Sequence, residues 1–255
     1  MFAYIVYILL WLPLHIIYPL RVIGRKNILK KGRMIFSANH QTVNDAVMTY
    51  VYIPRRFKYM GKASLFKNPI LGWFLRSIGA YPVHQEQSDI ASVKKTLKYL
   101  KEEKAVCIFP EGKRLESDEN NQIRNGVVMF SLKSKAPIVP AIFVKKTLAF
   151  RPNTLLIGKP LELYKMEEFA NCKVDKETLG RASEYLKNAI YSLKKDYLQK
   201  KKDKQFAKYQ DKIIVLEKKK AKVYTFAKNL KKIIKLDKKI AVLEEQQQLA
   251  IAKIK

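Results

Sequence analysis

The chain has 255 residues and 48% hydrophobic residues, which is enough for one packed domain and an extension. Its formal net charge of +29 is extreme for a soluble enzyme and comes mainly from lysine. Such a charge favours an anionic partner: a lipid surface, nucleic acid or an acidic carrier protein. With only two cysteines, Cys107 and Cys172, the composition argues against a disulfide framework or a cysteine metal site and indicates a reducing compartment.

The first 20 residues contain no charged side chain, and their number suits a bilayer span. Pro13 and Pro19 would bend a straight helix, so we expect either a full span or a shallow, re-entrant anchor. Basic residues follow from Arg21 to Arg33, and the positive-inside rule then predicts a cell-membrane protein with its catalytic domain on the cytoplasmic side. We expect His15 to lie near the lipid headgroups and to have no catalytic role.

The middle of the chain alternates between short apolar runs and helical patterns. The expected strands are residues 34–38, 57–60, 81–83, 105–109, 138–144 and 154–157. The expected helices are residues 45–52, 69–78, 88–101 and 126–134, with Ser88 as the N-cap of the third. This order predicts an α/β domain in which helices flank both faces of a sheet, with an N-terminal membrane-anchoring segment and a long C-terminal basic helical extension.

The C-terminal region has no Gly or Pro after Gly180, which predicts a long helix from about residue 181, broken near Lys200. The last 75 residues hold 22 basic and 8 acidic side chains. An apolar stripe runs through Val223, Phe226, Leu230, Ile233, Ile240 and Leu243. It is compatible with contact to an anionic membrane, pairing with another helix, or docking on the domain. The expected divisions are a membrane anchor at 1–24, a catalytic domain at 25–200 and a lysine-rich tail at 201–255.

The first chemical motif is Asn39-His40 followed by Asp45, after an expected strand. An alcohol becomes a good nucleophile when a base removes its proton, and histidine suits this role at neutral pH. A carboxylate five positions later, at the start of a helix, can hold the other ring nitrogen. The pattern predicts a general base with its orienting partner, although such a pair also occurs in purely structural roles.

The second motif is Phe109 to Arg114, which follows another expected strand. Pro110 and Gly112 predict a tight turn whose backbone a ligand can approach. Arg114 has the planar fork that grips phosphate, and Lys113 adds a second cation. A surface turn with a structural Glu–Arg pair is the other interpretation.

Together with two further blocks, these motifs resemble the 1-acyl-glycerol-3-phosphate acyltransferase family. The blocks are Asn39-His40-x4-Asp45, residues 61–72 with their continuation to 79–83, Phe109–Arg114, and residues 137–142. The resemblance implies that His40 is the general base and Asp45 its partner, and that Glu111, Gly112 and Arg114 bind the phosphoglycerol of the acceptor, with Lys62 assisting.

The resemblance also implies the reaction and its partners. The acceptor is lysophosphatidic acid, the donor is acyl-acyl carrier protein or acyl-CoA, and neither a metal, a cofactor nor a covalent acyl-enzyme is needed. Three positions depart from the family pattern. Gln85 stands where an Arg is usual, Lys113 replaces a Thr and can compensate for that charge, and Ser64 replaces an acid.

Two alternatives stay open at this point. One is another glycerol-based acceptor, such as glycerol-3-phosphate or a lysophospholipid, and the other is a basic membrane-binding protein with a decayed site. Nucleic acid is not an expected partner, because no aromatic–basic RNA-binding signature is present. Arg124 and Lys133 are further candidates for the site without motif support, and His84 is expected at its rim or surface.

Overall fold

The computed structural model describes residues 2–84, 89–112, 123–170, 172–225 and 230–253. The chain divides into two compact units, Met1–Leu193 and Lys194–Lys255. The strands of the first unit are β1 (Leu20–Ile23), β2 (Met34–Ala38), β3 (Phe57–Lys62), β4 (Ala80–Val83), β5 (Ala105–Ile108), β6 (Ile138–Phe143) and β7 (Asn153–Ile157). The α-helices are α1 (Phe2–Ile17), α2 (Asn44–Tyr52), α3 (Pro69–Ser77), α4 (Ile90–Lys101), α5 (Gly126–Ser134), α6 (Glu167–Ala170), α7 (Lys176–Thr225) and α8 (Leu230–Ala252). Short 3₁₀ turns are η1 (Arg25–Asn27), η2 (Ala63–Phe66) and η3 (Leu163–Lys165).

The seven strands form one mixed sheet in the order β1-β7-β6-β2-β5-β3-β4. The pairings from β6 through β2, β5 and β3 to β4 are parallel, whereas β7 is antiparallel to β6. Because β2, β5 and β3 run in the same direction, their carboxyl ends share one edge of the sheet. Ligand sites in open α/β sheets form at that edge.

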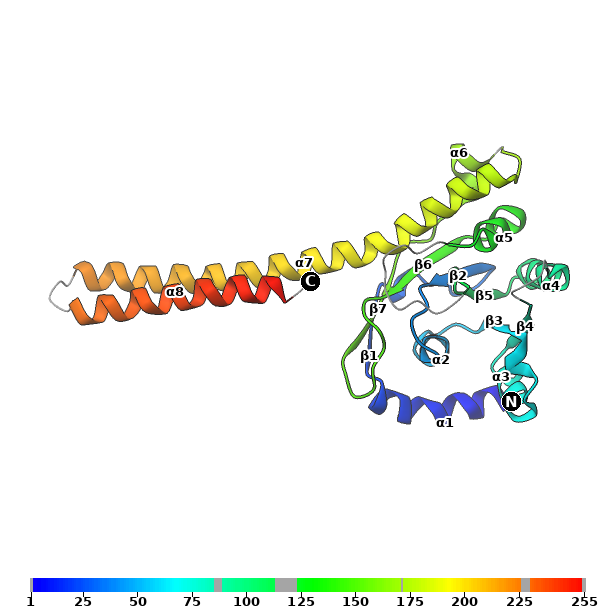
Figure 1. Cartoon of the computed structure of the whole chain (residues 1–255), viewed down its shortest axis with the longest axis horizontal. Coiled ribbons are helices and arrows are strands. Elements are labelled where there is room, and N and C mark those ends of the chain that lie inside the picture. The colour runs from blue at the N-terminus through cyan, green and yellow to red at the C-terminus, as the bar shows by residue number, and fades with distance from the viewer. Residues whose placement is uncertain (1, 85–88, 113–122, 171, 226–229, 254–255) are drawn as a thin grey trace. The chain divides into compact units, whose positions relative to one another are not determined.

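Helices cover both faces of the sheet, as the sequence predicts. Met34 and Phe36 of β2 belong to the core cluster against which α1, α2 and α3 pack. Ile35 points to the opposite face and is also fully buried. Helix α4 contacts β5 and helix α5 contacts β2, and Leu100 of α4 and Val128 of α5 are fully buried as well. Figure 1 shows α4 and α5 side by side on their face. The central strands are therefore inaccessible to water except at their ends.

Two helix boundaries predicted from sequence are wrong. Helix α4 begins at Ile90, and its N-cap is Asp89, whose carboxylate accepts the backbone N–H of Ser92 at 2.9 Å. Ser88 itself lies outside the described residues. An ionised carboxylate suits the helix N-terminus, because it also complements the helix dipole. The break expected near Lys200 is absent, since α7 runs unbroken from Lys176 to Thr225, and lysine is a good helix former.

The apolar N-terminus forms a helix and then a strand. Helix α1 has 16 residues, and Tyr7 and Leu14 on one side of it pack against the core. Its opposite side exposes Ile8, Leu9 and Leu12. Among the described residues, no helix combines the length and the apolar character that a membrane span requires. Strand β1 follows at once and pairs with β7, which the sequence pattern did not predict.

His15 on α1 has a structural environment. Its Nδ1 donates a hydrogen bond to the carbonyl oxygen of Trp11 at 2.7 Å. Its ring stacks on Tyr52 of α2, with the ring centres 4.1 Å apart. These contacts connect α1 to α2, so His15 contributes to the packing of the two helices.

The second unit is a helical hairpin in which α8 returns along the last part of α7 (Figure 1). Lys220 of α7 forms an ion pair with Asp237 of α8, and the Gln247 amide donates to the Phe206 carbonyl at 3.4 Å. The apolar stripe of α8 is half-buried at Ile233, Ile240 and Leu243. Its residues thus serve helix pairing, one of the three interpretations of the tail.

Candidate active site

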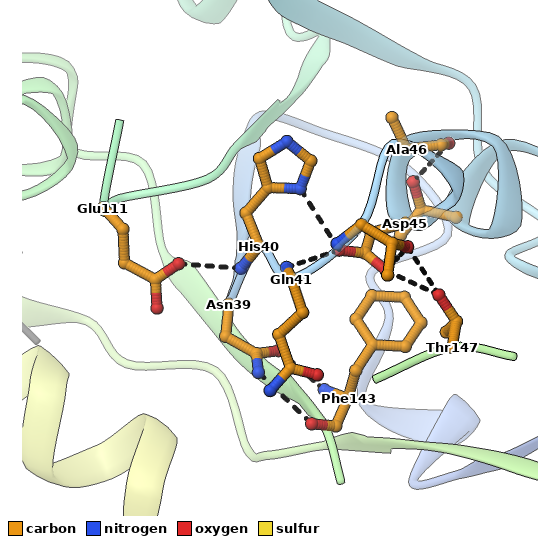
Figure 2. Close-up of polar contacts among 10 residues, drawn as sticks. Asn39, His40, Gln41, Asp45, Ala46, Glu111, Phe143 and Thr147 are labelled. Atoms are coloured by element: carbon orange, nitrogen blue, oxygen red, sulfur yellow. Dashed lines mark hydrogen bonds and ion pairs between the residues drawn. The ribbon is translucent and has the colours of Figure 1, made fainter. Parts of the chain in front are cut away.

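The end of β2 is fixed by Asn39, the first residue of the His motif. Its side-chain oxygen accepts the backbone N–H of Phe143 at 2.7 Å, and its side-chain nitrogen donates to the Phe143 carbonyl at 3.2 Å. Asn39 is 1% exposed. The Asn39 side chain thus adds two hydrogen bonds beyond the last backbone pairing of β2 with β6. These bonds fix the point at which the chain leaves the sheet, just before His40 (Figure 2).

The His40 side chain faces Asp45, as the motif predicts. Its Nδ1 lies 3.2 Å from Oδ2 of Asp45 (Figure 2). The imidazole also stacks on Phe109, with ring centres 4.3 Å apart and planes 20° apart. These two contacts fix the ring from its edge and its face, while 22% of the side chain stays exposed.

Asp45 lies in the first turn of α2 and is fully buried. Burial alone would raise the pKa of its carboxyl, but hydrogen bonds from His40, Thr42 and Gln41 outweigh it and lower that pKa. The backbone N–H groups of Gln41 and Thr42 each lie 2.7 Å from Oδ2, and the Thr42 hydroxyl lies 2.8 Å from Oδ1. The carboxylate is therefore ionised at neutral pH.

The charge of Asp45 determines the tautomer of His40. An ionised carboxylate can only accept hydrogen bonds, so Nδ1 of His40 must donate. The lone pair of the ring then belongs to Nε2, and no described residue forms a hydrogen bond to that nitrogen. The pair is thus arranged as a base with a held ring and one nitrogen available to a ligand.

Thr147 completes the environment of Asp45, and the motifs did not predict it. This residue follows β6, is 4% exposed, and donates from its hydroxyl to Oδ1 of Asp45 at 3.1 Å. The same hydroxyl lies 2.5 Å from that of Thr42. The two hydroxyls hold one carboxylate oxygen, which leaves the other aligned with His40.

The turn after β5 brings Glu111 beside the base. Glu111 is 6% exposed, and its Oε2 accepts the backbone N–H of His40 at 2.8 Å (Figure 2). Its Oε1 accepts the hydroxyl of Tyr191, on α7, at 3.0 Å. The Glu111 carboxylate thus connects this turn to the main chain of His40.

Gly112 has the conformation that the turn requires. Its φ of 68° lies in the left-handed region, which glycine adopts without strain. A Cβ at this position would also overlap the Arg124 guanidinium. Arg124, which had no motif support, is therefore a cation directly at the turn, whereas Lys133 is exposed in the last turn of α5.

The remaining predicted residues fall into two groups. Lys62 is exposed at the carboxyl end of β3, on the same sheet edge as His40 but without a hydrogen bond to it. Lys113, Arg114 and Gln85 lie outside the described residues. His84 is exposed, as expected of a rim position. Within the part of the chain that the structure describes, no three His, Cys, Asp or Glu side chains are grouped to hold a metal ion.

Known proteins similar to this chain share an activity. A family model described as Acyltransferase matches residues 19–144. A 1-acyl-sn-glycerol-3-phosphate acyltransferase of Bacillus subtilis is 32% identical over 179 residues, covering 68% of this chain and 87% of that protein. One of Streptococcus pneumoniae is 31% identical over 111 residues, covering 43% of this chain and only 40% of that protein.

A solved structure has a similar fold. It is the 1-acyl-sn-glycerophosphate (LPA) acyltransferase of Thermotoga maritima, which superposes with a TM-score of 0.54 at 21% identity. The superposition covers 76% of this chain and 77% of that one. It therefore includes most of the sheet domain.

Proposed function

Because this chain belongs to the 1-acyl-sn-glycerol-3-phosphate acyltransferase family, we propose that it transfers a fatty acyl group from a thioester to the free hydroxyl of lysophosphatidic acid. The product is phosphatidic acid, a precursor in phospholipid synthesis. The donor in this proposal is acyl-acyl carrier protein or acyl-CoA. The observation that supports the chemistry best is the His40–Asp45 pair, whose Nε2 is available to a hydroxyl group.

The reaction follows from that pair. Nε2 of His40 takes the proton of the acceptor hydroxyl as its oxygen attacks the thioester carbonyl. The negative charge of Asp45, 3.2 Å from Nδ1, stabilises the imidazolium that forms. When the tetrahedral intermediate collapses, the new C–O ester bond replaces the C–S bond, and the imidazolium returns its proton to the departing thiolate. No side chain becomes acylated.

Acceptor recognition requires cations near the base. The turn at Gly112 has Arg124 against it, and the sequence adds Lys113 and Arg114 immediately after it. Guanidinium groups bind phosphate through paired hydrogen bonds, so we assign the acceptor phosphate to this turn. Lys62, at the end of β3, is the proposed additional cation on the same edge.

Membrane contact is part of the same proposal, because the acceptor is a lipid. The exposed apolar residues of α1 include Ile8, Leu9 and Ile16, and those of α3 include Ile70 and Trp73. Helices α1 and α3 both pack against the same core cluster, so their outer sides belong to one side of the domain. We propose that this side rests in the headgroup layer of the cell membrane, with the catalytic domain on the cytoplasmic side.

An acyl-transfer assay in lipid vesicles tests the function. The acceptors are lysophosphatidic acid, glycerol-3-phosphate and a lysophospholipid with a zwitterionic headgroup, each with both donors. We expect activity with lysophosphatidic acid and a loss of about 10²–10⁴-fold in His40→Ala, the usual contribution of a general base. A different preferred acceptor would refute the substrate assignment, and full activity in His40→Ala would refute the mechanism.

A further inference from the structure

Tyr191 connects a C-terminal helix to the catalytic motifs. It lies on α7, and its hydroxyl donates to Oε1 of Glu111 at 3.0 Å. The other oxygen of Glu111 accepts the backbone N–H of His40 at 2.8 Å. Two hydrogen bonds therefore lead from the Tyr191 hydroxyl to the main chain of the proposed base. All three residues belong to the same compact unit.

Glu111, which lies between Tyr191 and His40 in this chain of hydrogen bonds, has little contact with solvent. Glu111 is 6% exposed, so few water molecules can replace a lost protein donor. A buried acceptor that loses one of its donors destabilises the arrangement around it, especially when the acceptor is charged. The position of Glu111, and with it the His40 main chain, is thus sensitive to the Tyr191 hydroxyl.

The rest of α7 holds Tyr191 in place. Its neighbour Ile190 is 1% exposed, and Leu186, one turn earlier, is fully buried. Ser183 donates its hydroxyl to the Asn125 side chain at 2.9 Å, just before α5. Leu193 packs closely against Gly158, since a Cβ added to this glycine would lie only 3.2 Å from the Leu193 side chain. Contacts on both sides of Tyr191 therefore anchor this part of the helix to the sheet domain.

We propose that Tyr191 is a positioning residue for acyl transfer, acting through Glu111 on the main chain of His40. It touches neither substrate nor the reacting atoms in this proposal. Its hydroxyl holds the Glu111 carboxylate, which in turn holds His40 where β2 ends, so that the ring meets Asp45 and Phe109. Misplacement of a catalytic group by about 1 Å can cost on the order of 10²-fold in rate.

The proposal gives α7 a part in the active site. The acyltransferase family model matches residues 19–144, so Tyr191 comes from a segment beyond it. The same contacts assign Glu111 a role in holding the base, in addition to any contact with the acceptor. The expected change in kcat rests on the proposed function. The expected change in hydrogen–deuterium exchange rests only on the hydrogen bonds of Tyr191 and Glu111.

The test compares Tyr191→Phe with Tyr185→Phe in the full-length protein. Both changes remove one hydroxyl from α7 and keep the ring. Tyr185, however, is 41% exposed, and among the described residues its side chain has only a ring contact, with Phe169. We expect Tyr191→Phe to lower kcat by roughly tenfold with KM for the acyl donor unchanged, since the effect is on geometry. Tyr185→Phe should match the wild type, and both variants should melt within a few degrees of it. A kcat within twofold of wild type for Tyr191→Phe, or an equal loss in Tyr185→Phe, would overturn the proposal.

Two further measurements separate positioning from a general loss of structure. Tyr191→Phe should speed hydrogen–deuterium exchange in the peptide containing His40 and leave the α4 peptide unchanged. In a Glu111→Gln background, Tyr191→Phe should lower kcat little further, because the two residues act in series. If the two substitutions lowered kcat independently, so that their losses multiplied, Tyr191 would not act through Glu111. Unchanged hydrogen–deuterium exchange in the His40 peptide would refute the proposal as well. If the wild type itself transfers no acyl group, the proposed function fails, while the exchange experiment still decides whether Tyr191 holds the His40 main chain.

Discussion

Replacing Asp45 by Asn removes the charge beside His40 and keeps most of the hydrogen bonds. Oδ2 accepts from His40 Nδ1 and from the N–H groups of Gln41 and Thr42, and an Asn oxygen can do the same. Oδ1 accepts from the hydroxyls of Thr42 and Thr147. An Asn amide in that place can donate to these hydroxyls, because they also accept. The variant should therefore fold and keep the tautomer of His40.

The size of the effect follows from the distance between the charges. At about 4 Å and an effective dielectric constant of about 20, a carboxylate and an imidazolium attract by about 4 kcal/mol. Because every 1.36 kcal/mol in the barrier is tenfold in rate, a full loss would slow the reaction by about 10³-fold. The Asn dipole retains a part of the attraction, so we expect a decrease in kcat of about 10²- to 10³-fold.

The assay measures phosphatidic acid formation in vesicles at saturating donor and acceptor, together with thermal melting. Asp89→Asn is the matched control, since this carboxylate also accepts backbone N–H groups, from His84 and Ser92, but it caps α4 and has no hydrogen bond to His40 in the described part of the chain. It should keep wild-type activity, because Asn is an equally good N-cap. If Asp45→Asn kept more than about a tenth of the wild-type kcat, the electrostatic argument would be wrong.

Four further outcomes test other parts of the site and of the membrane contact. Thr147→Val should lower kcat severalfold and stability by about 1 kcal/mol, the usual value of a hydrogen bond, and unchanged kinetics would exclude a role in holding Asp45. Arg124→Ala should raise KM for lysophosphatidic acid more than KM for the donor, and equal shifts would argue against a phosphate contact. The double change of Ile70 and Trp73 to Glu should reduce binding to vesicles without lowering the melting temperature, whereas unchanged sedimentation with vesicles would exclude this surface. Because the pKa of Asp45 is lower in the folded chain, its ionised form stabilises the fold above about pH 4, and this stabilisation disappears as pH falls through the native pKa. Melting temperatures of the wild type should therefore fall more steeply below pH 4 than those of Asp45→Asn, and parallel curves would contradict the shift.

The sequence by itself determined the parts of the protein that depend on near neighbours. His40 and Asp45 are five positions apart at a strand–helix junction, so local geometry alone allows them to meet. The turn at Gly112 follows from residue type, because a left-handed φ favours glycine. Strands β2 to β7 were recognisable from short apolar runs, since strands covered on both faces are apolar throughout.

Elements that depend on distant partners were not predictable in this way. Residues 20–23 lie where the uncharged N-terminal run gives way to basic residues, and they form a strand only because β7, about 130 positions later, supplies their hydrogen bonds. The tail stripe was compatible with lipid or with another helix. The hairpin in which α8 pairs with α7 depends on a chain reversal, of which the apolar spacing gives no sign.

The tertiary structure alone decided which polar residues surround the base. Thr147 reaches Asp45 across 102 positions, and Tyr191 reaches Glu111 across 80. Neither stands in a motif, and a single Thr in a loop or Tyr on a helix has the same pattern whether it faces water or a buried carboxylate. Short spacing determined that His40 meets Asp45, whereas the packing of α7 and of the loop after β6 determined how firmly this proposed base is held, because only folding brings the distant hydroxyls of Thr147 and Tyr191 to these carboxylates.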